Sequence, residues 1–255
     1  MRHAGTRSDE LLAVCSRHIL PPSCGAVVPE PYIPHVPQNW NGTLVLAEAQ
    51  NLSNTYRSYR DALLRWPSEA RMTRLGRRPG LDVHPWDDGW LKLAVHVAFG
   101  LGPLETAVSN AVLWSQIDAN GANKKPSPEL QNRSAVVWKE LLPILQPKHV
   151  ITAGMISYSI FGRASTGSPA PWRHTALVFP AAPNISRWLK DHEARTLLLA
   201  YPEVAQAQRE RAEWFQGNTR HKTLFACHAV EESTRTLPYG PPTIRLHRLM
   251  GEEQV

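Results

Sequence analysis

Four short apolar runs, separated by segments of helical pattern, constrain the fold of this chain more than any other feature. They cover residues 43–47, 107–113, 149–153 and 175–179. Their apolar residues are continuous rather than alternating, which is typical of strands buried on both faces. Strands that alternate with helices form a parallel sheet with helices on both sides. The sequence therefore predicts an α/β fold, a three-layer α/β/α arrangement around a central four-stranded, mainly parallel twisted sheet.

Six segments carry the helical pattern between and around these runs. The predicted helices span residues 9–18, 53–66, 88–99, 128–145, 157–161 and 185–215. Ser127 is a capping residue followed by Pro128 at the first helical position, which marks the start of the fourth helix. The last helix is interrupted near Pro202, and the fifth ends at Gly162. We expect the proline-rich run 21–37 to wrap the domain in an extended conformation.

The length of 255 residues suits one domain. Residues 1–39 are predicted to be an N-terminal wrap and residues 40–200 the core that bears the motifs. Residues 217–255 are an extension of unknown role. Within it, 222–230 and 243–250 are interpreted as extra strands or as a partner-binding segment.

Charge and hydropathy limit the partners. The chain has 28 Lys and Arg against 22 Asp and Glu, a net charge of +6. That excess favours a polyanionic partner, although an ordinary basic enzyme remains an equal alternative. No apolar run approaches the roughly 18 residues that would cross a bilayer, and no secretory signal is evident. We expect a cytoplasmic protein without membrane contact.

Polar residues follow the predicted strands at the edge where parallel sheets bind ligands, the carboxyl ends of the strands. Glu48 comes directly after the first run, and Asn110 lies within the second. The fourth run leads into the proline-rich loop 179–184. A carboxylate, an amide and this loop are therefore expected to meet at one edge.

The order of motifs around these residues resembles the uracil-DNA glycosylase superfamily, most nearly its iron–sulfur branch (family four). Ala47-Glu48-Ala49-Gln50-Asn51 is similar to the Gly-Glu-Ala-Pro-Gly motif of that branch. Ser109-Asn110-Ala111-Val112 is similar to its Thr-Asn-Val-Val strand, and Asn123-Lys124-Lys125-Pro126-Ser127-Pro128-Glu129 to its basic loop. Pro147-Lys148-His149-Val150-Ile151-Thr152-Ala153-Gly154 matches its Pro-Lys-x-Val-Ile-x-x-Gly segment closely. Phe179-Pro180-Ala181 matches its His-Pro-Ser motif only at the proline.

The resemblance implies an enzyme that hydrolyses the bond between a flipped-out base, uracil or a related damaged base, and its deoxyribose. Breaking that bond makes the sugar positive and the base negative. A carboxylate is needed near the sugar, and hydrogen-bond donors near the base. Glu48 is assigned to position the attacking water and to stabilise the sugar. Asn110 is assigned to recognise O4 and N3–H of uracil, which cytosine presents with the opposite polarity.

The resemblance assigns further residues to the substrate and to DNA. The predicted substrate-binding residues, with Tyr56 and Tyr59 as alternative stacking platforms for the base, are Ala47, Ala49, Gln50, Asn51, Asn110, Tyr56, Tyr59, Phe179 and Asn184. The predicted DNA-binding residues, which include phosphate contacts and a wedge at Pro183 and Ile185, are Lys124, Lys125, Ser127, Ala181, Pro183, Ile185 and Arg187.

Three departures separate this chain from that branch. Its three cysteines, Cys15, Cys24 and Cys227, are too few for a cluster, so no cofactor or metal is expected. Phe179 replaces the histidine that donates to the leaving base, and a main-chain N–H in 181–184 or the Asn184 amide is the suggested substitute. Gln50-Asn51 replaces Pro-Gly, and either side chain could hold a water or the base.

Two alternatives come from other functional classes. The first is a catalytically weak or inactive protein that binds DNA and senses damage on the same fold, which the Phe179 replacement supports. The second is a metal-dependent hydrolase that uses His84, Asp87 and Asp88, although their spacing fits no strong metal motif and either aspartate also suits a helix cap.

Overall fold

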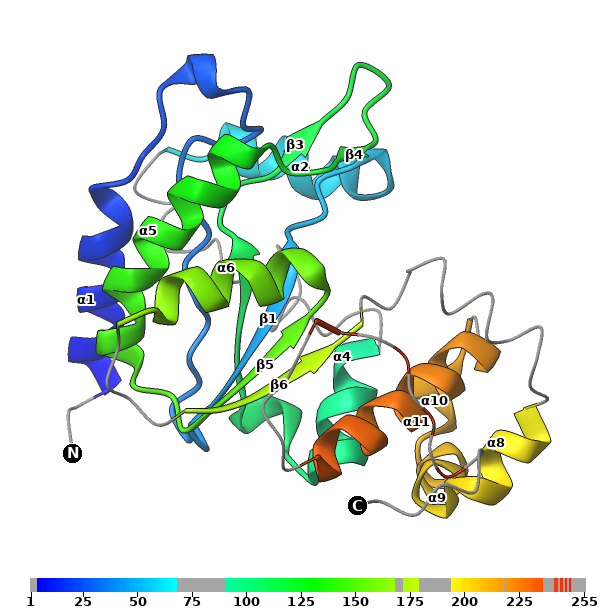
Figure 1. Ribbon diagram of the computed structural model, residues 1–255. Coiled ribbons are helices and arrows are strands. Elements are labelled where there is room, and N and C mark those ends of the chain that lie inside the picture. The colour runs from blue at the N-terminus through cyan, green and yellow to red at the C-terminus, as the bar shows by residue number, and fades with distance from the viewer. Residues whose placement is uncertain are drawn as a thin grey trace.

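A parallel sheet forms the centre of the protein. The computed structural model describes residues 4–67, 90–167, 172–178, 194–217 and 219–235, with residues 241, 242, 244, 246 and 248. Its sheet contains β1 (Thr43–Ala49), β2 (Ala107–Val112), β5 (His149–Ala153) and β6 (Arg173–Leu177) in the order β2-β1-β5-β6 (Figure 1). All three pairings are parallel. The predicted four-stranded sheet is confirmed, although β6 begins and ends two residues before the predicted run.

Helices α1 (Ala4–Ser16), α5 (Pro128–Leu145) and α6 (Met155–Ser165) lie on one side of the sheet (Figure 1). They share a hydrophobic core with Leu44 and Leu46 of β1, whereas Val45 faces the other side because side chains alternate along a strand. Helix α5 has the predicted bounds, and the Ser127 hydroxyl accepts a hydrogen bond from the Leu130 N–H at 3.3 Å. Helix α6 is longer than predicted and continues through Gly162.

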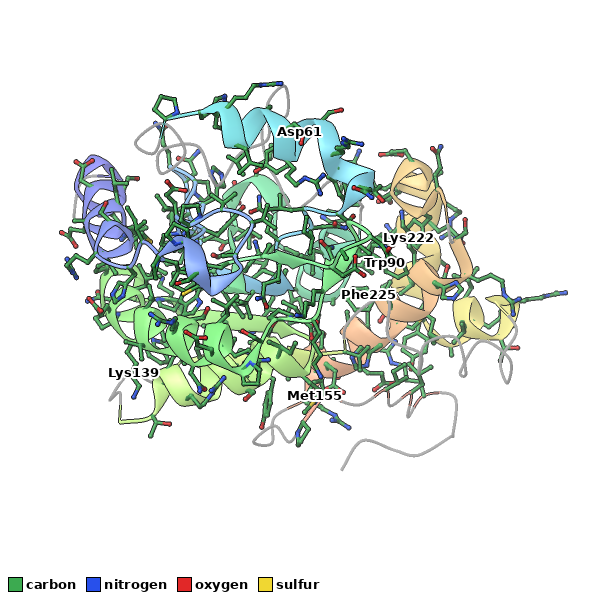
Figure 2. The ribbon with its side chains drawn as sticks, turned by 90° about the horizontal axis from the view of Figure 1, so that it is seen from above. Asp61, Trp90, Lys139, Met155, Lys222 and Phe225 are labelled. Atoms are coloured by element: carbon green, nitrogen blue, oxygen red, sulfur yellow. The ribbon has the colours of Figure 1, made fainter. Side chains whose placement is uncertain are left out.

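The helices on the opposite side come from the middle and the end of the chain. Helix α11 (Thr219–Thr234) packs on β6, and α4 (Trp90–Leu93) with the π-helical turn η3 (Ala94–Ala98) packs on α11. Helices α8 (Ala194–Ala200), α9 (Pro202–Glu210) and α10 (Ala212–Phe215) pack on these helices and on one another (Figure 1). Trp90 of α4 meets the edge of Phe225 of α11 with 5.7 Å between ring centroids (Figure 2). The sheet between two helical layers confirms the three-layer fold, and the predicted interruption at Pro202 is present.

Helix α11 corrects the interpretation of residues 222–230 as a strand. Its residues are buried throughout this stretch, against β6 and η3. A helix buried on all sides has a continuous apolar pattern, and periodicity alone does not distinguish it from a buried strand. The predicted extension is therefore, in this part, an element of the core.

The proline-rich run near the N-terminus, which includes the short helical turn η1 (Pro22–Cys24), wraps the domain as expected. It follows the outer edge of the sheet. The Tyr32 N–H donates to the Leu113 carbonyl at 2.7 Å, and His35 forms an antiparallel bridge with Val108. Backbone groups that an edge strand would leave unpaired are thus hydrogen-bonded.

The segments beyond β1 and β2 lie together at the carboxyl ends of the strands. The turn η2 (Asn54–Tyr56) leads into α2 (Arg57–Arg65). At the opposite end of the sheet, the turn η4 (Pro103–Glu105) precedes β2. Strands β3 (Gln116–Ile117) and β4 (Asn123–Lys124) form an antiparallel hairpin, and β4 lies in the segment 123–129 that was predicted as a loop. The Asn54 N–H joins η2 to this hairpin by donating to the Gly121 carbonyl at 2.8 Å. Within the described residues, the structure has no helix with the length and apolar character to cross a membrane.

Candidate functional site

Glu48 lies on β1 near the carboxyl edge of the sheet and is held at the start of α6. Its Oε1 accepts a hydrogen bond from the Ile156 N–H at 3.4 Å. Gly154, which immediately precedes α6, has a φ of +99°, and a Cβ placed there would overlap the Glu48 carboxylate. Glycine is required for both reasons, because the left-handed conformation and the close contact each disfavour a side chain. The segment 154–156 thus forms a fitted seat for this carboxylate.

The environment of Glu48 balances opposing effects on its protonation. Burial, the largest effect, raises the pKa of the carboxyl above its ordinary value. The hydrogen bond from Ile156 and the positive charge of Lys125 lower the pKa and oppose that rise. A half-buried carboxylate with a raised pKa is suited to accept a proton near neutral pH.

Asn110 lies on β2 directly beside Ala47 of β1 in the parallel register. Its side chain is 1 % exposed, and its Nδ2 has no hydrogen-bond partner among the described residues. A buried donor left unpaired costs about 1–3 kcal/mol. Stability alone gives no reason to keep an amide here, whereas a ligand with an acceptor would satisfy it.

Glu48 and Asn110 lie toward the same end of the sheet, but their side chains point to opposite faces of it. Asn110 is paired with Ala47, so Glu48 is one residue further along the neighbouring strand. Because side chains alternate, Asn110 points to the face of Val108 and Ala47, and Glu48 to the face covered by α6. The backbone positions of the two residues are therefore close, and their convergence on one ligand stays a prediction. Their side chains flank the end of β1.

Three predicted substrate-binding residues of the segment after β1 already have partners within the protein. The Gln50 Nε2 donates to the Tyr59 hydroxyl at 2.7 Å, and Tyr59 is buried in the core. The Asn51 Oδ1 accepts from both the N–H and the hydroxyl of Ser53. These hydrogen bonds fix the conformation of the segment that follows β1. Tyr56 is half-buried, which leaves it the more accessible of the two predicted stacking platforms.

The predicted phosphate-binding residues lie on the same end of the molecule. Lys124 and Lys125 are exposed at the end of β4, and Lys125 is near enough to Glu48 to affect its pKa. Ser127 is confirmed as the N-cap of α5, so its hydroxyl is engaged with the Leu130 N–H. The N-terminus of α5 therefore follows two exposed lysines, an arrangement that favours anions.

Of the other predicted site residues, Ala49 is the last residue of β1, and the following lie outside the described residues. They are Phe179, Ala181, Pro183, Asn184, Ile185 and Arg187, together with His84, Asp87 and Asp88 of the metal-hydrolase alternative. Among the residues that the structure describes, no group of three His, Cys, Asp or Glu side chains is placed to hold a metal ion.

The sequence interpretation missed His228 of α11. Its Nε2 accepts a hydrogen bond from the Val178 N–H at 3.1 Å, at the carboxyl end of β6. The side chain is fully buried, and burial lowers its pKa to about 3. Its Nδ1 has no partner among the described residues. The available signal was a lone histidine within the apolar run 224–230, which the strand interpretation did not use.

Comparison with models of known protein families and with curated proteins finds no match to this sequence. The motif resemblance and the geometry at the carboxyl ends of the strands therefore carry the functional argument.

Proposed function

We propose that the protein is a monofunctional DNA glycosylase of the uracil-DNA glycosylase superfamily. It hydrolyses the N-glycosidic bond of uracil or a related damaged base that is flipped out of DNA. The observation that carries the proposal is the pair formed by Glu48 and Asn110. A carboxylate held at the start of α6 and a buried amide whose donor has no partner in the described part of the chain flank the end of β1, where a parallel sheet binds its ligands.

Asn110 supplies base recognition in this proposal. A base above the end of β1 would present O4 to the Nδ2 donor, and N3–H to the amide oxygen. Cytosine carries an amino group and an unprotonated ring nitrogen at these positions, so both contacts would fail. Sites that hydrogen-bond a polar group discriminate strongly against an analogue that leaves the site unpaired.

Glu48 supplies the chemistry on the other side of the strand end. The carboxylate orients a water molecule and accepts one of its protons while the water oxygen attacks C1′. The C1′–N bond breaks and its electron pair leaves with the base as an anion; the proton held by the carboxyl then passes to the base through solvent, which gives the free base, an abasic sugar and the carboxylate again. The negative carboxylate also stabilises the positive charge that develops on the sugar. The raised pKa of Glu48 favours the proton transfer.

The DNA backbone would be held by charge. Lys124 and Lys125 are exposed beside the N-terminus of α5, and the chain carries a net charge of +6. Lysines that neutralise phosphates make binding weaken as salt increases.

The decisive experiment offers the protein single- and double-stranded oligonucleotides, each with one modified base, and measures abasic sites by alkaline cleavage. We expect product from uracil and a loss of about 10²–10⁴-fold in Glu48→Gln. Glu210→Gln, a change of an exposed carboxylate on α9, serves as the matched control and should retain activity. Absence of product from every modified base would refute the proposed activity.

The damage-sensing alternative is favoured by Phe179 at the position of the family histidine. The loss of one preorganised donor costs about 10²–10³-fold in rate. The same oligonucleotides distinguish the two functions. Tight, salt-sensitive binding of DNA without abasic product would identify a sensor. If Asn110→Ala then binds DNA without a preference for uracil, Asn110 belongs to the pocket that recognises the base.

A further inference from the structure

One peptide group links the buried His228 to the seat of Glu48. The peptide between Leu177 and Val178 is held at both ends, at the carboxyl end of β6. Its N–H donates to the His228 Nε2 at 3.1 Å, and its carbonyl accepts from the Gly154 N–H at 2.8 Å. Gly154 is in turn the residue whose Cα lies against the Glu48 carboxylate. His228 is thus connected to Glu48 through two hydrogen bonds and one close contact.

The hydrogen bond from Val178 fixes the chemical form of His228. An imidazole nitrogen that accepts a hydrogen bond carries no proton, so the proton of the neutral ring is on Nδ1. Burial favours the same neutral form. Strand β6 lies at the edge of the sheet, and a buried N–H there without an acceptor would cost about 1–3 kcal/mol.

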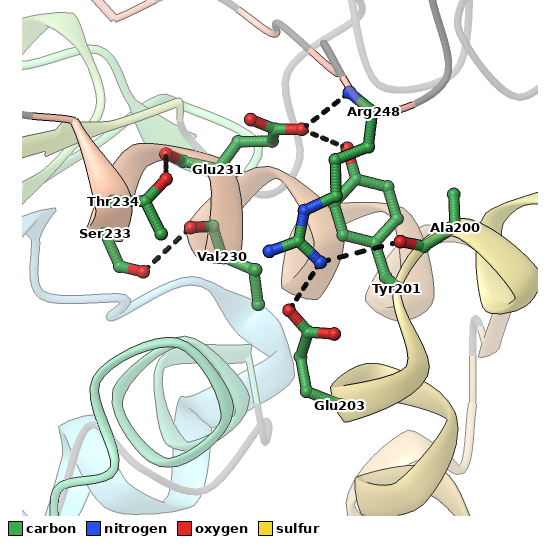
Figure 3. Close-up of polar contacts among 8 residues, drawn as sticks. All are labelled: Ala200, Tyr201, Glu203, Val230, Glu231, Ser233, Thr234 and Arg248. Carbon is green, nitrogen blue, oxygen red and sulfur yellow. Dashed lines mark hydrogen bonds and ion pairs between the residues drawn. The ribbon is translucent and has the colours of Figure 1, made fainter. Parts of the chain in front are cut away.

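Helix α11 is itself fixed where it carries His228. Glu231, three residues later and on the same side of the helix, is 1 % exposed. Its Oε1 accepts from the Tyr201 hydroxyl at 2.5 Å and from the Arg248 N–H at 3.1 Å (Figure 3). The Arg248 guanidinium lies over the Tyr201 ring and binds Glu203 at 2.7 Å. These contacts tie α11 to the junction of α8 and α9.

We propose that His228 is a positioning residue for Glu48. Its Nε2 holds the Leu177–Val178 peptide, the peptide holds the Gly154 N–H, and Gly154 sets where the carboxylate lies relative to the start of α6. This role rests on the proposed glycosylase function, because it is through Glu48 that His228 affects the reaction. Helix α11 lies outside the segments that carry the site motifs. The proposed role therefore brings a helix from the C-terminal part of the chain into the support of the site.

The test compares three variants in the full chain. His228→Leu removes the acceptor, whereas His228→Gln retains an acceptor oxygen in a side chain of similar reach. Cys227→Ala is the matched control, since it changes a fully buried neighbour on the same helix and leaves the His228 acceptor of the Val178 N–H in place. Misplacement of a reacting group from a distance lowers the rate by up to about 10²-fold. We expect kcat for abasic-site formation to fall about tenfold or more in His228→Leu, with KM nearly unchanged, and to recover in His228→Gln.

A second measurement does not depend on activity. A ¹³C titration of the Glu48 carboxyl and exchange of the Val178 and Gly154 amides report the linkage directly. We expect His228→Leu to shift the Glu48 pKa and to speed exchange at both amides, and Cys227→Ala to do neither. If the wild type makes no abasic sites, the proposed function fails and these spectra alone decide the linkage. Equal kcat in His228→Leu and Cys227→Ala, or an unchanged Glu48 titration in His228→Leu, would overturn the role of His228.

Discussion

Acidification should destabilise the protein through its buried histidines, and His228 should account for a measurable part of the loss. Burial lowers the pKa of His228 to about 3 and the pKa values of His149 and His174 to about 4 each, from an ordinary value of 6.5. Between these values the unfolded chain binds protons that the folded protein does not. Stability is therefore complete above pH 6.5 and declines as the pH falls below it.

The size of the His228 contribution follows from the fall in pH below its ordinary pKa. One pKa unit corresponds to about 1.4 kcal/mol, and pH 4.5 is two units below 6.5 and still above the folded value, so the loss is about 2–3 kcal/mol. The side chain is fully buried, so solvent does not screen this effect. The loss is a large share of the roughly 5–15 kcal/mol that stabilises a typical domain.

The assay is urea unfolding, followed by tryptophan fluorescence, at several pH values between 7 and 4.5. His228→Gln removes the titrating ring but retains an acceptor for the Val178 N–H. The free energy of unfolding of this variant should therefore fall by about 2–3 kcal/mol less than that of the wild type over this range. Cys227→Ala, a buried change on the same helix that removes no histidine, is the control and should retain the full dependence. Parallel stability curves for His228→Gln and the wild type would refute the reasoning.

Four further substitutions test the site and its supports. Gly154→Ala should lower stability by about 1–3 kcal/mol from its positive φ alone, and the added Cβ would overlap the Glu48 carboxylate and lower kcat by displacing it; chemical unfolding and the abasic-site assay measure the two effects. Asn110→Leu should leave stability unchanged or raise it in thermal unfolding, since it removes an unpaired donor, while uracil processing is lost. Ser127→Ala should cost about 0.5–2 kcal/mol in urea unfolding through loss of the α5 cap, with little effect on kcat. Tyr201→Phe should cost about 1–3 kcal/mol, because a buried carboxylate loses a donor, and an undiminished melting temperature would contradict this account.

The strands and the best-capped helix could be predicted from local sequence. Continuous apolar runs identified the parallel strands because such strands are buried on both faces. The pair Ser127-Pro128 located the start of α5 to the residue, since a cap and a proline at the first helical position act through local backbone geometry. The rule that ligands bind at the carboxyl ends of parallel strands placed Glu48 and Asn110 at one edge.

Local pattern failed where burial or long-range pairing decided the outcome. Helix α11 was interpreted as a strand because it is buried on all sides, which removes the amphipathic period. The β3–β4 hairpin has two residues in each strand, too few for an alternating pattern to appear. Gln50 was expected at the substrate, yet its amide binds the Tyr59 hydroxyl inside the core, a contact between residues nine positions apart.

By itself, the sequence of this protein determined which segments form the parallel strands, where α5 begins, and that a carboxylate and an amide lie on two of these strands. Only the tertiary structure decided that Glu48 fits against Gly154, that the Asn110 donor has no partner among the described residues, and that His228 reaches the end of β6 from a helix 50 residues later in the chain. The reason is physical. Strand and cap preferences act between near neighbours in the chain, whereas hydrogen bonds and close contacts between distant segments exist only after the layers have packed together.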